Sequence, residues 1–125
     1  MLKDAEAFSG FSVDDLEAAR AFYGDTLGLE LADDGPGFTL TLGTGAAVLV
    51  YPTGDGHTPG SFTHLNFPVD DIDAAVERLS AAGVTFEDLP YTDDKGVMRG
   101  RSQDMGPDIA WFKDPAGNTL SVLQE

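Results

Sequence analysis

The chain has 125 residues, 42% of them hydrophobic, which is enough for one domain with a moderate core. It contains no cysteine, and this excludes disulfides, a thiol nucleophile and thiolate metal ligands. Its formal net charge is −15, from 22 acidic and 7 basic residues, and such a surface repels nucleic acid and anionic membranes.

The first residues lack the sustained apolar run of a signal peptide. No stretch approaches the roughly 20 apolar residues that a membrane-spanning helix needs. We therefore expect a soluble, cytoplasmic protein that binds neither nucleic acid nor membranes.

The first predicted strand covers residues 7–13, a short and largely apolar run. Asp14 is then predicted to N-cap a helix near residues 14–27, with Glu17 completing a capping box and Gly28 supplying the left-handed stop. Three further strands are predicted over residues 29–32, 38–42 and 46–51, because turn-forming sequences separate these runs.

Residues 53–60, rich in glycine, proline and aspartate, are predicted to connect this first module (5–52) to a second (61–125). The second begins with a strand over 61–69, and Asp70 is predicted to cap a helix near 70–82 that ends at Gly83. A short strand over 84–87, a long polar loop over 89–107 and a hairpin of 108–113 with 119–124 complete the chain.

An internal repeat relates the two modules. The stretch Phe11–Ala19 returns 56 residues later as Phe67–Ala75, with six of nine positions identical. Such a match inside a short chain indicates a duplicated structural unit. We therefore predict one α+β domain, spanning residues 1–125, that arose by duplication.

Several motifs together resemble the vicinal oxygen chelate superfamily, the group of glyoxalase I, bleomycin-resistance proteins and extradiol dioxygenases. They are Asp15-Leu16 followed by Phe22-Tyr23 and Leu27-Gly28-Leu29, His64 ahead of Val69-Asp70-Asp71-Ile72, and the turn Asp114-Pro115-Ala116-Gly117-Asn118. The resemblance covers nearly the whole chain. It implies two βαβββ modules related by pseudo-twofold symmetry, with curved mixed sheets that form a half-open cavity, commonly in a homodimer.

The resemblance also implies where a divalent metal would be held, at equivalent strand positions of the two modules. In this chain those four positions are Phe8, Leu49, His64 and Ser121, the last where the family has glutamate. A catalytic divalent site keeps about three protein ligands. One imidazole and one hydroxyl cannot provide them, so we expect neither a metal nor another cofactor.

The same four positions are expected to face the cavity and to bind a ligand. Tyr51 and Trp111 join them, since Tyr51 lies two residues from Leu49 and Trp111 lies on the strand paired with that of Ser121. Residues 98–101, with Met98, Arg99 and Arg101, could close over the cavity as a rim or lid, or form a solvated loop. The expected ligand-binding residues are Phe8, Leu49, Tyr51, His64, Met98, Arg99, Trp111 and Ser121.

The leading functional hypothesis is a metal-independent protein of the bleomycin-resistance type that binds a small organic molecule. The alternative from another class is a lyase, isomerase or dioxygenase relative that uses an atypical metal site or His64 as acid and base. A regulatory or interaction module with a degenerate cavity is the third. For His64 the competing interpretation is a buried histidine with a backbone partner, and for the strand aromatics it is core filling.

Overall fold

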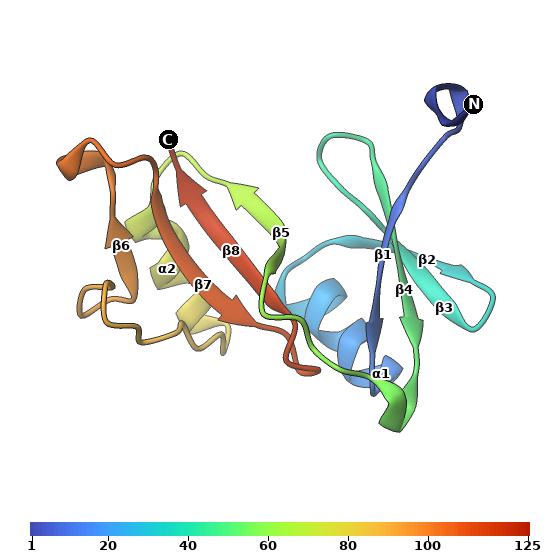
Figure 1. Cartoon of the computed structure of the whole chain (residues 1–125). Coiled ribbons are helices and arrows are strands. Elements are labelled where there is room, and N and C mark those ends of the chain that lie inside the picture. Colours follow the sequence, from blue (N-terminus) through green and yellow to red (C-terminus); the bar gives the residue numbers. More distant parts are fainter. The chain divides into compact units, whose positions relative to one another are not determined.

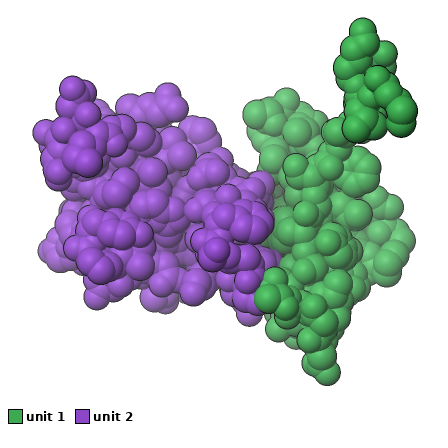
Figure 2. All heavy atoms as spheres, viewed as in Figure 1, with its two compact units in different colours: residues 1–58 green, residues 59–125 purple.

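A computed structural model describes all residues from 1 to 125 and divides them into two compact units, residues 1–58 and 59–125 (Figure 2). The boundary falls within the segment 53–60 that we expected to be a connector. Each unit is considered by itself below. None of the helices is both long and apolar enough to cross a membrane.

Unit 1, residues 1–58, contains one four-stranded sheet and one main helix. Its elements are a 3₁₀ turn Leu2–Asp4, β1 Ser9–Val13, α1 Leu16–Arg20 continuing as the π-helix Ala21–Thr26, β2 Glu30–Asp34, β3 Gly37–Thr41, β4 Ala47–Pro52 and a 3₁₀ turn Gly54–Gly56. The strand order is β1-β4-β3-β2, in which β1 and β4 are parallel and the other pairs antiparallel.

Unit 2, residues 59–125, repeats this topology. It contains β5 Thr63–Pro68, α2 Ile72–Ala81, β6 Val97–Arg99, a 3₁₀ turn Arg101–Gln103, β7 Asp108–Lys113 and β8 Thr119–Gln124. The order is β5-β8-β7-β6, again with a parallel pair, β5 and β8, and antiparallel pairs elsewhere. The predicted pair of βαβββ modules in an α+β fold is therefore confirmed.

The core of each unit lies between its helix and one face of its sheet. In unit 2, α2 packs behind β7 and β8 (Figure 1), and the strand residues on that side are buried. Successive strand residues point to opposite faces, so every second residue goes into the core. These core residues are Ala110 and Phe112 of β7, Leu120 and Val122 of β8, and Ile72 and Val76 of α2.

The helix caps correct one of our predictions. The capping residues are Asp15 and Asp71, one position later than the Asp14 and Asp70 that we expected. The backbone N–H of Ala18 donates to Asp15 Oδ1, and that of Ala74 donates to Asp71 Oδ1, each at 3.1 Å. With Asp15 as the N-cap, the residue three positions later is Ala18, so the capping box that we expected between Asp14 and Glu17 is also wrong.

The segment between α2 and β7 differs from the prediction in two ways. Instead of a strand at 84–87 there is a single bridge between Phe86 and Phe112. The long loop expected over 89–107 contains the short strand β6. Asp93 turns the chain into this strand, because its Oδ1 accepts hydrogen bonds from the backbone N–H groups of Lys95 and Val97.

The position of the second cap can be tested by two neighbouring substitutions. Asp71→Ala removes the acceptor for the Ala74 N–H, so we expect the free energy of unfolding to fall by about 1 kcal/mol in urea denaturation. Asp70→Ala, the control, leaves that bond in place and should change stability by less than about 0.5 kcal/mol. A larger loss for Asp70→Ala would place the cap where the sequence first suggested.

Candidate functional site

The sheet of unit 2 has a face that α2 does not cover, which we call the helix-free face. On the β7–β8 ladder its residues form three pairs, Ile109 with Leu123, Trp111 with Ser121, and Lys113 with Thr119. They alternate with the buried residues under α2. The strand pairing thus brings Trp111 and Ser121, two of the expected ligand-binding residues, side by side.

Ser121 is fully buried and hydrogen-bonded to β5. Its hydroxyl donates to Asn66 Oδ1 at 2.6 Å, and the two residues are direct partners in the parallel register. A buried hydroxyl needs such an acceptor. Asn66 itself is exposed. Sequence reasoning missed Asn66, although its place two residues after His64 puts it on the same side of an alternating strand.

His64 lies where the pairing of β5 with β8 is irregular. The register shifts between Thr63 and Leu65, so His64 occupies a bulge and is half-buried. Burial lowers the pKa of His64, while the charge of Asp114 and a backbone hydrogen bond with Thr119 act to raise it. The net shift is downward from about 6.5, so the imidazole is neutral at pH 7.

Asp114 holds the turn between β7 and β8, which the sequence predicted. Its Oδ1 accepts from the backbone N–H groups of Ala116 and Asn118, and its Oδ2 accepts from Asn118 Nδ2 at 3.0 Å. The carboxylate is buried, and these three hydrogen bonds compensate for its loss of water. They stabilise the turn and therefore the adjoining ends of β7 and β8.

A cavity of about 310 Å³ opens beside Trp111. Tyr91 meets the indole of Trp111 edge to face, with ring centroids 5.8 Å apart. Lys113 lies 3.7 Å from Glu87 at the same cavity. The remaining lining residues are Gly60, Ser61, Thr63, Leu89, Gly117 and Thr119. Tyr91 was not among the predicted residues, since nothing in its polar surroundings marks it except its aromatic ring.

Met98 and Arg99 belong to β6 and point to opposite sides of the sheet. Met98 pairs with Ile109 and shares the helix-free face, whereas Arg99 pairs with Asp108 and lies on the side of α2. The guanidinium of Arg99 donates to Asp73 of α2 at 2.7 and 3.1 Å and to Asp93 at 2.8 Å. Arg99 therefore differs from the lid residue that we expected, because carboxylates already hold it.

Charges around Arg99 explain three pKa shifts. Hydrogen bonding to Arg99 lowers the pKa of Asp73, and the same contacts raise the pKa of Arg99. Burial acts to raise the pKa of Asp93, but hydrogen bonds from Val97, Arg99 and Lys95 outweigh it and lower this pKa. The cluster thus fastens β6 to the first turn of α2.

In unit 1, Leu49 and Tyr51 of β4 lie on the face opposite the helix. Leu49 pairs with Gly10 and Tyr51 with Ser12, whereas Phe11, between them on β1, contacts Tyr23 of the π-helix. The expected residue Phe8 precedes β1 and is 71% exposed. His57, from the connector, also reaches β1, with its Nδ1 2.7 Å from the hydroxyl oxygen of Ser12.

The resemblance noted in the sequence implied four metal positions, Phe8, Leu49, His64 and Ser121, and these residues do not fit a divalent cation. Phe8 and Leu49 carry no donor atom, and the Ser121 hydroxyl is used by Asn66. The chain has no group of three or more His, Cys, Asp or Glu side chains placed to hold a metal ion. His64 would be left as the single good ligand, and a catalytic site needs about three.

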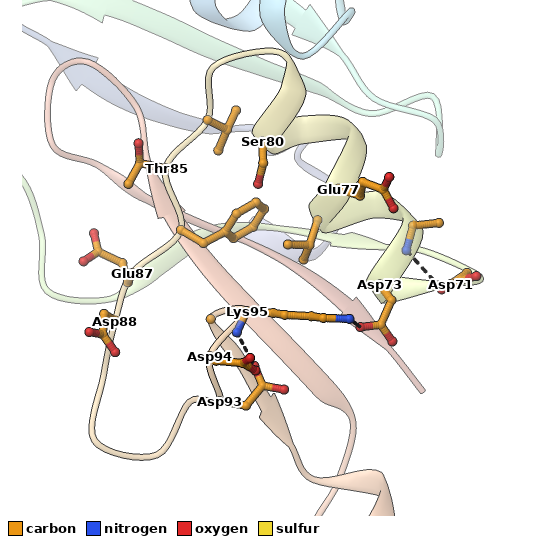
Figure 3. Close-up of a pocket in the computed structure, with 15 residues that line it drawn as sticks. Asp71, Asp73, Glu77, Ser80, Thr85, Glu87, Asp88, Asp93, Asp94 and Lys95 are labelled. Atoms are coloured by element: carbon orange, nitrogen blue, oxygen red, sulfur yellow. Dashed lines mark hydrogen bonds and ion pairs between the residues drawn. The ribbon is translucent and has the colours of Figure 1, made fainter.

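A larger cavity, of about 930 Å³, lies on the other side of unit 2, between α2 and residues 84–96. Carboxylates dominate its rim, and the ammonium of Lys95 reaches across to Asp73 at 3.6 Å (Figure 3). None of the residues that we expected to bind a ligand lines it. The size of a cavity therefore does not identify the ligand site. The helix-free face instead carries three of the expected ligand-binding residues, Met98, Trp111 and Ser121.

A model of the Glyoxalase/Bleomycin resistance protein/Dioxygenase superfamily matches residues 8–122. No curated protein matches the chain. Among solved structures, lactoylglutathione lyase from Agrobacterium tumefaciens is similar at 26% identity and a TM-score of 0.68, over 97% of this chain and 93% of that one. The antibiotic binding protein TnmS3 from Streptomyces is similar at 26% identity and a TM-score of 0.62, over 97% of both chains. A glyoxalase family protein from Enterococcus faecalis shares the fold at 21% identity and a TM-score of 0.70, over 98% of this chain and 99% of that one.

The structural role of Arg99 predicts a loss of stability on substitution. Arg99→Ala removes hydrogen bonds to Asp73 and Asp93, so we expect the free energy of unfolding to fall by about 1 kcal/mol, and by less at high salt. Urea denaturation at two salt concentrations measures this.

Arg101→Ala is the matched control, because its guanidinium is more exposed and lies 3.6 Å from Asp108. It should cost clearly less stability. Equal losses for the two variants would contradict the role that we assign to Arg99.

The lowered pKa of His64 predicts a pH dependence of folding. The unfolded chain binds a proton at His64 more readily than the folded chain, so stability should fall as the pH drops below about 6.5. In His64→Gln, which cannot titrate, the loss of stability between pH 7 and pH 5 should be smaller than in the wild type. An identical loss in both proteins, measured by urea denaturation at each pH, would contradict the shift.

Proposed function

The chain belongs to the Glyoxalase/Bleomycin resistance protein/Dioxygenase superfamily, and we propose that this member binds a small organic molecule without a metal. In this proposal the protein sequesters its ligand and does not transform it. The ligand rests on the helix-free face of unit 2. Trp111 is its main anchor, His64 and Met98 belong to the surrounding surface, and the fully buried Ser121 lies beneath that surface.

The observation that carries the proposal is the aromatic corner of Trp111 and Tyr91. The two rings stand at 85° to each other and line a cavity of about 310 Å³, within the size range of small-molecule pockets. A flat ring can stack on one of them and meet the edge of the other. Hydroxyl groups of Ser61, Thr63 and Thr119 add polar contacts at the cavity.

The donor chemistry supports binding over metal-dependent catalysis. Lactoylglutathione lyase and TnmS3 have the same sequence identity to this chain, 26%, with TM-scores of 0.68 and 0.62, so identity does not distinguish between them. His64 without a second good ligand favours the mode of TnmS3, an antibiotic binding protein. We therefore propose an aromatic compound of the antibiotic type as the ligand class.

The net charge of the chain favours ligands that carry positive charge. A charge of −15 attracts cations during approach, although screening confines this field to roughly 8–10 Å at physiological salt. Arg99 offers no counter-argument for an anionic ligand, because its guanidinium is already paired with the carboxylates of Asp73 and Asp93. The expectation from the sequence that Leu49, Tyr51 and Phe8 of unit 1 contact a ligand remains a prediction, and so does the homodimer.

The proposal predicts that the one tryptophan of the chain reports binding directly. Metal-free bleomycin and the aromatic ketone 2-acetylnaphthalene serve as probes, and titration should shift the single indole N–H resonance of Trp111 to saturation. Trp111→Leu should weaken binding at least about tenfold in calorimetry, because it removes the stacking surface. Met105→Ala, which removes an exposed apolar side chain outside the cavity, should leave the affinity unchanged. Failure of both probes to bind would overturn the proposal.

Metal analysis and an activity assay separate this function from the enzymatic alternatives. Protein purified without chelator should contain less than stoichiometric divalent metal. With zinc or nickel added, it should not convert the hemithioacetal of methylglyoxal and glutathione. A stoichiometric metal that is lost in His64→Gln, or turnover that depends on His64, would instead support a lyase.

A further inference from the structure

We infer that Asn66 selects the ligand, by presenting its amide N–H₂ group as a hydrogen-bond donor that Ser121 holds in a fixed orientation. Ligands with a carbonyl or similar acceptor are then preferred over those without one. This inference rests on the proposed function, because it concerns a ligand on the helix-free face.

The orientation of the amide follows from the burial of Ser121. Its hydroxyl is fully buried and must donate its hydrogen to a protein acceptor, which is Asn66 Oδ1 at 2.6 Å. If the amide turned over, a donor would face the hydroxyl and its hydrogen would lose this acceptor. Since the oxygen of Asn66 is used in this way, the two N–H donors are directed elsewhere, and the residue is exposed.

The position of Asn66 lets it act together with Trp111. The residues Asn66, Ser121 and Trp111 form one row across the neighbouring strands β5, β8 and β7. Adjacent strands lie about 4.8 Å apart, so Asn66 and Trp111 are separated by roughly 10 Å. Of the three residues, Ser121 is fully buried whereas Asn66 is exposed, so a bicyclic ring on Trp111 that extends toward β5 can bring its substituent to the Asn66 amide.

This polar pair is particular to unit 2. The partners at the corresponding positions of unit 1 are Gly10 and Leu49, also direct neighbours in a parallel pair of strands. A β-carbon at Gly10 would lie 3.2 Å from the carbonyl oxygen of Leu49, so space there is limited. The two copies of the module therefore offer different chemistry at the same point, and only unit 2 has a donor there.

The experiment compares two probes of similar shape, 2-acetylnaphthalene with a carbonyl acceptor and 2-ethylnaphthalene without one. Affinities are measured from the indole resonance of Trp111. The wild type should bind the ketone about tenfold more tightly than the hydrocarbon. Asn66→Leu should abolish this preference and leave binding of the hydrocarbon in place.

Two further variants test the orientation. Asn66→Asp keeps the acceptor for Ser121 but removes the donor, so the ketone should lose its advantage. Ser121→Ala leaves the amide free to turn, so the preference should shrink while both probes still bind. Gln103→Leu, which removes an exposed amide elsewhere in unit 2, is the control and should behave like the wild type.

The outcomes separate this inference from the proposed function. Equal affinity of the wild type for the two probes, or a preference that survives in Asn66→Leu, would overturn the role of Asn66 while leaving ligand binding intact. Binding of neither probe, nor of bleomycin, would overturn the proposed function and this inference with it.

Discussion

The parallel pairing of β5 with β8 is the contact on which the organisation of unit 2 depends. It joins the first strand of the unit to the last, and it leaves the order β5-β8-β7-β6 with β8 inside the sheet. Because side chains alternate along each strand, this one register decides two things together. Leu120 and Val122 enter the core under α2, while Ser121 comes to lie between Asn66 and Trp111 on the helix-free face. A shift of one residue would place Ser121 in the core and Leu120 and Val122 on the helix-free face.

Electrostatics shape the other side of the sheet. The chain has far more acidic than basic residues, so each basic side chain has several carboxylates with which it could pair. Arg99 binds Asp73 and Asp93 and thereby links β6 to the start of α2. The hydrogen bonds from Arg99 help to lower the pKa of both carboxylates below the ordinary value for aspartate. A residue that the sequence offered as a ligand contact is thus better explained as a structural tie.

The two modules show how a duplicated unit can diverge at one position while its frame is kept. Topology, helix caps at Asp15 and Asp71, and the left-handed glycines Gly28 and Gly83 are common to both. The parallel strand pair differs, with Gly10 and Leu49 paired in unit 1 and Asn66 and Ser121 paired in unit 2. Backbone geometry is repeated because caps, turns and core packing require it, whereas the helix-free faces are under no such requirement and can adopt separate ligand chemistry.

The sequence by itself determined the repeat, the order of strands and helices outside residues 84–107, the hairpin over 108–124 and the family, because these depend on local periodicity, turn residues and spaced motifs. It also placed Trp111 and Ser121 together, since simple alternation holds on a regular antiparallel ladder. It missed β6, which at three residues is too short to show a period. It displaced both caps by one residue because each is preceded by a second aspartate. Only the tertiary structure decided that Arg99 binds Asp73, that His64 sits in a bulge, and that Ser121 donates to Asn66. These contacts join residues far apart in the chain, and their partners are chosen by strand register and packing, which no local pattern encodes.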